Sequence, residues 1–92
     1  MAFTGDTVRL IVKFRNFDGK AIDPTDVKLK IFSESEQTIE EFQLNDTNRL
    51  EIGVFYFDYI VPVGEGNLIY EFSGMVNGKP IITRGTIERR FI

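Results

Sequence analysis

The apolar residues of this chain recur at every second position, and this period constrains the fold more than any other feature of the sequence. Between residues 7 and 15, the apolar residues Val8, Leu10, Val12 and Phe14 alternate with a polar face that only Ile11 interrupts. Successive side chains of a β-strand point to opposite faces, so such a segment has one apolar and one polar face. A half-buried strand is therefore predicted here, and helix has little support anywhere in the chain.

The same alternation predicts several further strands. It covers residues 27–31, 39–44, 54–61, 68–72 and 81–91, with a short strand near Leu50 and Ile52. Residues 54–61 are richest in β-branched and aromatic side chains and both faces are partly apolar, so this strand is predicted to be central. The residues predicted to face the core are Leu10, Val12, Leu29, Phe55, Phe57, Tyr70 and Phe72.

Turn-forming residues separate these strands. Asn77-Gly78 is the strongest signal, because both residues accept the positive φ of a type I′ hairpin turn. Polar turns are also predicted at residues 16–19, 33–36 and 45–48. Pro24 cannot donate to a central ladder, so residues 22–25 are predicted to form a kinked passage at a sheet edge. Gly85, inside the last strand, is predicted to mark a bulge or bend.

The number and spacing of these segments predict one all-β domain. About seven short strands, spaced about 8 to 12 residues apart, are typical of an antiparallel β-sandwich. The chain has 92 residues, of which 42% are hydrophobic, and this length leaves no room for a second core. The 9 Phe and 3 Tyr supply the large side chains that a small core needs. We therefore expect a single domain over residues 1–92.

The composition removes most catalytic and metal-binding chemistry. Cysteine and histidine are absent, so there is no thiolate ligand, cysteine nucleophile or imidazole base. We expect a protein that is not an enzyme and needs no cofactor. The net charge of −3, with both signs mixed along the chain, does not favour nucleic-acid binding. No apolar run reaches the ~18 residues of a membrane helix and residues 1–6 do not resemble a signal peptide, so cytoplasmic synthesis and no membrane contact are expected.

Three segments resemble a recurring immunoglobulin-like domain of bacterial and phage proteins. They are residues 5–10 opening a strand, residues 16–24 as a turn and kink, and residues 53–59 leading into Val61-Pro62. The resemblance implies a single antiparallel immunoglobulin-like β-sandwich. Short chains of this kind resemble small structural proteins of tailed phages and prophages. The paired Cys and buried Trp of antibody domains are absent, so antigen-receptor function is not implied.

Three aspartates, Asp18, Asp23 and Asp26, lie in one loop region, where their oxygen atoms are suitable ligands for Ca²⁺. Their spacing matches no calcium-binding loop. Turn chemistry accounts for an aspartate beside a glycine and for another before a proline. No metal site is therefore predicted, and calcium binding is the alternative.

Two other polar features have both a structural and a functional interpretation. The acidic stretch is interpreted as a solvated face, with docking on a basic patch of another virion protein as the alternative. Its members are Glu34, Glu36, Glu40 and Glu41. Tyr56 and Tyr59 are interpreted as core residues, of which one clasps the fold by a hydrogen bond to backbone. Stacking on a sugar ring is the alternative role for these two rings.

The C-terminal strand is the predicted interaction surface. An open sandwich leaves edge backbone groups unpaired, and such edges pair with another chain unless they are protected. Residues 22–25 have the Pro and Asp composition of a protected edge, whereas residues 81–87 are rich in β-formers. Arg and Phe near the C-terminus are types enriched at protein interfaces. The predicted interface residues are Ile82, Arg84, Thr86, Arg89, Arg90, Phe91 and Ile92.

These features together predict a non-enzymatic structural or accessory protein of a phage or prophage virion, in its head, neck or tail. It would be made in the cytoplasm, assembled into the virion, and docked on other virion proteins and on copies of itself. The alternative is an adhesin-like surface module that binds carbohydrate or another ligand, and the missing secretion signal counts against it. An enzyme that uses carboxylates alone is a third alternative, although nothing in the sequence selects a catalytic pair.

Overall fold

The computed structural model describes residues 2–3, 5–16 and 18–90, and its regular structure is almost entirely β-strand. The strands are β1 (Ala2–Phe3), β2 (Thr7–Lys13), β3 (Thr25–Ser33), β4 (Thr38–Gln43), β5 (Arg49–Glu51), β6 (Val54–Ile60), β7 (Leu68–Val76), β8 (Lys79–Ile87) and β9 (Arg89–Arg90). One turn of 3-10 helix, η1 (Asp46–Asn48), precedes β5. The two-residue period therefore predicts the main strands, although the single strand predicted over residues 81–91 is divided into β8 and β9. The described residues contain no α-helix.

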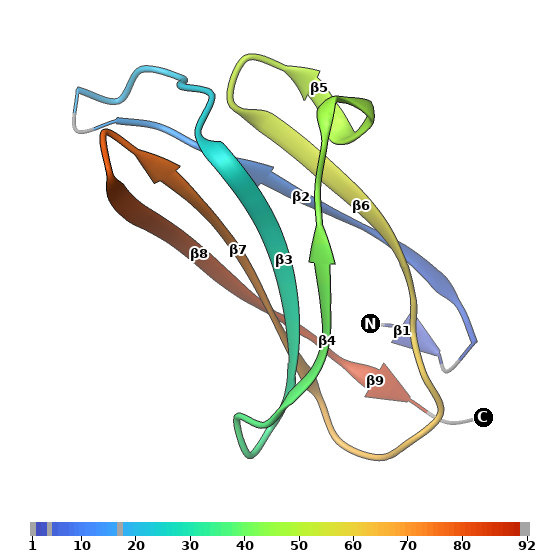
Figure 1. The fold of residues 1–92 in the computed structure, drawn as a ribbon. Helices are drawn as coiled ribbons and strands as arrows, with labels where there is room; N and C mark the ends of the chain where they lie inside the picture. Colours follow the sequence, from blue (N-terminus) through green and yellow to red (C-terminus); the bar gives the residue numbers. More distant parts are fainter. Residues whose placement is uncertain (1, 4, 17, 91–92) are drawn as a thin grey trace.

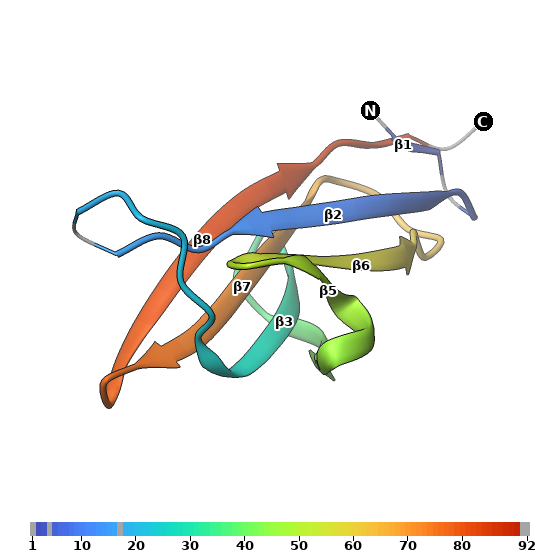
Figure 2. The ribbon, with the colours of Figure 1, turned by 90° about the horizontal axis from the view of Figure 1, so that it is seen from above.

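The strands form two layers, shown from the side in Figure 1 and from above in Figure 2. One sheet has the order β2-β6-β5 and the other the order β4-β3-β7-β8, and all of their pairs are antiparallel. The short strands β1 and β9 form a separate parallel pair. With the first sheet taken as strands B, E and D and the second as C′, C, F and G, this is the order of an immunoglobulin-type sandwich. The predicted fold class is confirmed, and β6 is central in its sheet, as predicted.

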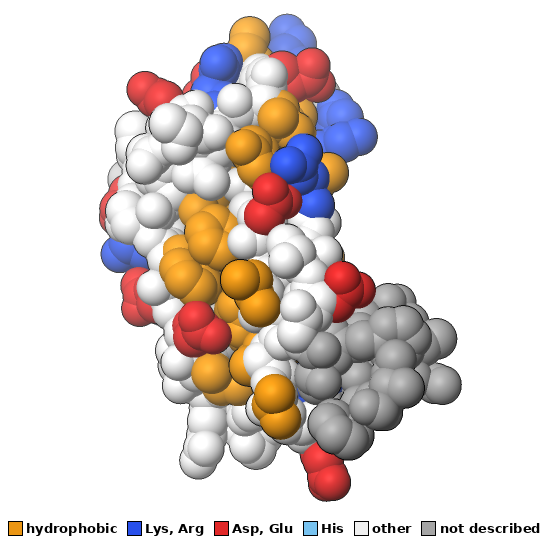
Figure 3. Space-filling model, turned by 90° about the vertical axis from the view of Figure 1, so that its right-hand side faces the viewer, with side chains coloured by type: hydrophobic (Ala, Val, Ile, Leu, Met, Phe, Trp, Pro, Cys, Tyr) orange, Lys and Arg blue, Asp and Glu red, His pale blue; other side chains and the backbone are white. Residues whose placement is uncertain are grey.

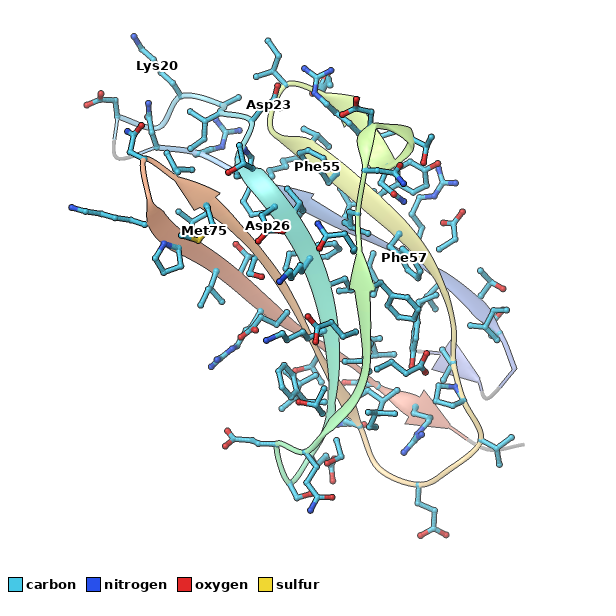
Figure 4. The ribbon with its side chains drawn as sticks, in the orientation of Figure 1. Lys20, Asp23, Asp26, Phe55, Phe57 and Met75 are labelled. Atoms are coloured by element: carbon cyan, nitrogen blue, oxygen red, sulfur yellow. The ribbon has the colours of Figure 1, made fainter. Side chains whose placement is uncertain are left out.

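The core lies between the two sheets and contains most of the predicted residues. Those that are buried are Leu10, Val12, Leu29, Phe55 and Phe72. Phe57 and Tyr70 pack against this core from inward positions but stay partly exposed. Phe57 lies on β6 beyond Phe55 (Figure 4) and stacks on Phe42 of the edge strand β4, with ring centroids 4.4 Å apart. Both rings therefore face inward, as predicted, and Phe57 stays partly exposed because its neighbour Phe42 lies on an edge strand.

The hairpin between β7 and β8 contains the predicted turn but not the predicted bulge. Asn77 and Gly78 have φ angles of 53° and 75°, as a type I′ turn requires. The register then runs without interruption along both strands, so Gly85 marks no bulge. Gly85 lies opposite Tyr70, and a Cβ atom there would come within 2.3 Å of the tyrosine side chain. Glycine is required at this position because the Tyr70 ring packs directly against its backbone.

Residues 22–25 do not form a sheet edge, contrary to the prediction. They lead into β3, which lies inside its sheet between β4 and β7. Pro24 is buried just before the first paired residue, Thr25, so its missing N–H interrupts no ladder bond. Its ring lies over Gly74 of β7, where an added Cβ atom would come within 2.7 Å of the proline Cβ. The edges of this sheet are instead β4 and β8.

Candidate interaction surface

β8 forms an open edge of the four-stranded sheet. All 9 of its residues pair with β7, and no described strand pairs with its other side. In a two-residue hairpin the pair beside the turn is hydrogen-bonded, and bonded and non-bonded pairs then alternate along the strands. By this alternation, the backbone N–H and C=O groups of Ile82, Arg84 and Thr86 point away from β7. These groups are available to another strand.

Three of the predicted interface residues lie together on this edge. Ile82, Arg84 and Thr86 alternate along β8, so their side chains share the outer face of the sheet, and all three are exposed. Ile82 is an apolar side chain with 54% of its surface exposed. β8 therefore presents outward backbone groups together with one apolar, one cationic and one hydroxyl side chain.

A row of alternating charges crosses the outer face of this sheet and ends at Arg84. From β4 through β3 and β7 to β8, the register aligns Glu41, Lys30, Glu71 and Arg84. Glu71 is only 6% exposed, and the Arg84 Nε donates to its Oε1 at 2.7 Å. A buried carboxylate needs such a partner, because an unpaired one would carry a large desolvation penalty. Arg84 is held in place by this bond while 65% of its side chain stays exposed.

A shallow pocket of about 240 Å³ opens beside Arg84 on the same face. Its lining residues are Phe32, Glu36, Ile69 and Arg84. Phe32 and Ile69 lie opposite each other on β3 and β7 and supply the apolar part of the lining. Glu36, from the turn after β3, and Arg84 supply one charge of each sign. The pocket therefore combines two apolar side chains with one charge of each sign.

The C-terminal part of the predicted interface has a different environment. Arg89 reaches back to the loop between β6 and β7, where its guanidinium donates to the backbone carbonyls of Pro62, Glu65 and Gly66. The donors of Arg89 are therefore used inside the molecule, where they stabilise this loop. Arg90 belongs to β9 and pairs with β1. Phe91 and Ile92 lie outside the described residues, so the prediction for them stays a prediction.

Two of the three aspartates of residues 18–26, Asp23 and Asp26, form contacts with other parts of the chain. Asp23 accepts a hydrogen bond from the Gly53 N–H at 2.7 Å and pairs with Arg49, whose Nη2 lies 3.0 Å from Oδ2. The hydrogen bond from Arg49 first, and that from Gly53 second, lower the pKa of Asp23 below its ordinary value. Asp26 lies 3.8 Å from Lys28. Within residues 2–3, 5–16 and 18–90, no group of three or more acidic, His or Cys side chains is placed to hold a metal ion.

Tyr59 links the two sheets, but through a different partner from the one predicted. Its ring is buried and its hydroxyl donates to the Glu40 Oε1 of β4 at 2.9 Å, rather than to a backbone carbonyl. Burial first, and the hydrogen bond to Glu40 second, raise the pKa of Tyr59 above its ordinary value.

The predicted acidic stretch contains Glu40 and three further glutamates. One of these, Glu34, accepts a hydrogen bond from the Asn67 N–H at 2.8 Å. Glu34 and Glu40 therefore stabilise the fold through these hydrogen bonds. Glu36 and Glu41 are exposed.

Tyr56 lies on the outer face of β6, so its interpretation as a core residue is wrong, and Arg9 covers its ring. The guanidinium carbon of Arg9 lies 4.4 Å from the ring centroid, and two of its nitrogens donate to Asp58 at 2.8 and 3.0 Å. One face of the ring that a sugar would need is therefore occupied by a cation.

The exposed apolar residues Ile11 and Ile60 belong to β2 and β6, which pair with each other. Figure 3 shows hydrophobic side chains gathered in a band on the side of the molecule that β6 borders.

Comparisons of the chain with family models, curated proteins and solved structures find no match. No helix in the described part of the chain is long and apolar enough to cross a bilayer. The candidate interaction surface is the open edge of β8, with its exposed Ile82, Arg84 and Thr86.

Proposed function

We propose that this protein is a non-enzymatic structural or accessory protein that docks on other proteins by strand addition along β8. The observation that carries the proposal is the pairing of β8 on one side only, over all 9 of its residues. Main-chain hydrogen bonds to such an edge supply affinity, and the side chains beside it supply specificity. The sequence resemblance to small phage and prophage proteins makes a virion, at its head, neck or tail, the setting that we propose.

The longer edge strand of the other sheet, β2, is less suited to strand addition. β2 is an edge strand of the three-stranded sheet. Hydrogen bonds from the Val61 N–H to the Asp6 carbonyl and from the Phe14 N–H to the Gly53 carbonyl determine which residues of β2 form hydrogen-bonded pairs with β6. The outward backbone groups then belong to residues 7, 9, 11 and 13, two of which are Arg or Lys. Charged side chains are a common protection of sheet edges. On β8 only Arg84 is charged among the outward positions, and Glu71 already pairs with it.

The test mixes the purified protein with purified virion proteins encoded by neighbouring genes and measures the mass of the complexes by light scattering. Ile82→Pro combined with Thr86→Pro removes two outward N–H groups and leaves the ladder to β7 intact. We expect this double variant to bind such a partner at least about tenfold more weakly than the parent protein.

Ile82→Ala is the matched control, because it shortens the side chain and keeps both N–H groups, so it should still bind. Thermal melting establishes that each variant is folded. The proposal is contradicted if the parent binds none of the virion proteins, or if the folded double variant binds as tightly as the parent.

A further inference from the structure

The two edges of the four-stranded sheet, β4 and β8, are complementary in direction. Because every pair in the order β4-β3-β7-β8 is antiparallel, β4 and β8 run in opposite directions. A second copy, moved sideways along the sheet without turning over, would place its β4 antiparallel beside β8 of the first copy. The sheet would then continue from one copy to the next.

The outward backbone groups of β4 match those of β8. The Leu44 N–H donates to the Val27 carbonyl at 2.9 Å, so these two residues form a hydrogen-bonded pair at the end of β4. Alternation from this pair leaves the N–H and C=O groups of Gln43 and Glu41 pointing away from β3. Both residues are exposed, and no described strand pairs with this side of β4. Two complementary sets of backbone groups therefore face outward from the sheet.

The charged side chains favour one register for the pairing of β8 with β4 of a second copy. The charge row begins with Glu41 at the β4 edge and ends with Arg84 at the β8 edge. A second copy in the same row places its Glu41 beside Arg84, so the alternation of signs continues. Opposite charges directly across an antiparallel pair stabilise it, whereas equal charges destabilise it. A two-fold pairing of β8 with β8 on this row would instead bring two Arg84 side chains together.

We infer that a second copy of this chain occupies the β8 edge, through its own β4 edge, with Arg84 opposite Glu41 and Ile82 opposite Gln43. This inference rests on the proposed function, since it names a partner for the same edge. The pairing is head-to-tail, so an assembly of any length still presents one open β4 edge at one end and one open β8 edge at the other, and association continues beyond two copies.

Two edge-blocking variants test the joint by sedimentation velocity over a concentration series. Ile82→Pro removes an outward N–H of β8 and Glu41→Pro removes one of β4, and neither N–H belongs to a bond inside the sheet. The parent protein should grow in mass with concentration, and each variant alone should associate at least about tenfold more weakly. An equimolar mixture of the two variants should form a one-to-one dimer and nothing larger, because one intact edge of each kind remains.

Ile11→Pro is the matched control, since it places the same substitution at an outward position of β2, and it should associate like the parent. Glu41→Lys avoids proline and sets a cation beside Arg84, so it should also prevent growth. The inference is overturned if folded Glu41→Pro or Glu41→Lys associates like the parent, or if the folded mixture stays monomeric. A parent that binds a virion protein through β8 but never itself overturns the inference and leaves the proposed function standing.

Discussion

Two phenylalanines at inward positions differ in how completely their neighbours cover them. Phe72 is 0% exposed, whereas Phe57 is only partly buried and stacks on Phe42 of an edge strand. We expect Phe72→Ala to lower the free energy of unfolding by about 3–5 kcal/mol, as for a fully buried ring. Phe57→Ala should lower it by about 1–3 kcal/mol, because water already reaches part of that ring. Urea unfolding measures both, and an equal or larger loss for Phe57→Ala would disprove the assigned burial.

Gly85 is required by the residue on the strand beside it. A Cβ atom at Gly85 would lie 2.3 Å from the Tyr70 side chain, so Gly85→Ala should destabilise the protein by about 1–3 kcal/mol through overpacking. In a Tyr70→Ala background the same substitution should destabilise much less, since the ring is gone. A double-mutant cycle measures this coupling. Additive losses would mean that the glycine is required for a reason other than the ring.

Among the elements, the turn between β5 and β6 is held by a side chain from outside both strands. Asp23, which lies just before β3 (Figure 4), accepts from the Gly53 N–H and pairs with Arg49. Its lowered pKa means that the folded state favours the ionised carboxylate. This stabilisation is complete above the ordinary pKa of 3.8 and is lost as the pH falls through the lower pKa of the folded state.

Asp23→Asn should therefore lower the melting temperature at neutral pH. The difference from the parent should shrink as the pH falls from about 5 toward 2, because protonation removes the same charge from the parent. Glu65→Gln, which removes one exposed negative charge from the loop between β6 and β7, is the control for net charge. Calorimetry across this range decides the matter, and a constant difference between parent and Asp23→Asn would show that the carboxylate charge is not what holds the turn.

The two-residue period locates strands well, but it contains no information on what lies across from each residue. A proline before a strand is compatible with an edge or with the entrance to a central strand, and the position of Pro24 is decided by β4 and β7 on either side of β3. A glycine within a strand is compatible with a bulge or with a close contact, and Tyr70 on the neighbouring strand decides for Gly85. The charge row through Glu71 likewise depends on the register of four strands.

For the whole molecule, composition and strand spacing predict the all-β class and a two-layer sandwich, while the order of strands follows only from their pairing. The candidate interaction surface is likewise predictable only in part. Ile82, Arg84 and Thr86 are predictable because they alternate within a segment of β-formers. The environment of Arg89 is not predictable, because its partners are backbone carbonyls of a distant loop. The pocket beside Arg84 also combines residues from β3, the turn after it, β7 and β8.

The twist of the four-stranded sheet sets the symmetry of any assembly that extends it. Neighbouring strands are rotated by about 20–25° and lie about 4.8 Å apart. Each added copy contributes four strands, so it is turned by about 80–100° and advanced by about 19 Å relative to the copy before it. About four copies then complete one turn of a screw whose axis runs across the strands. Copies related in this way build a helical fibre rather than a flat ring, with the three-stranded sheets winding around its outside.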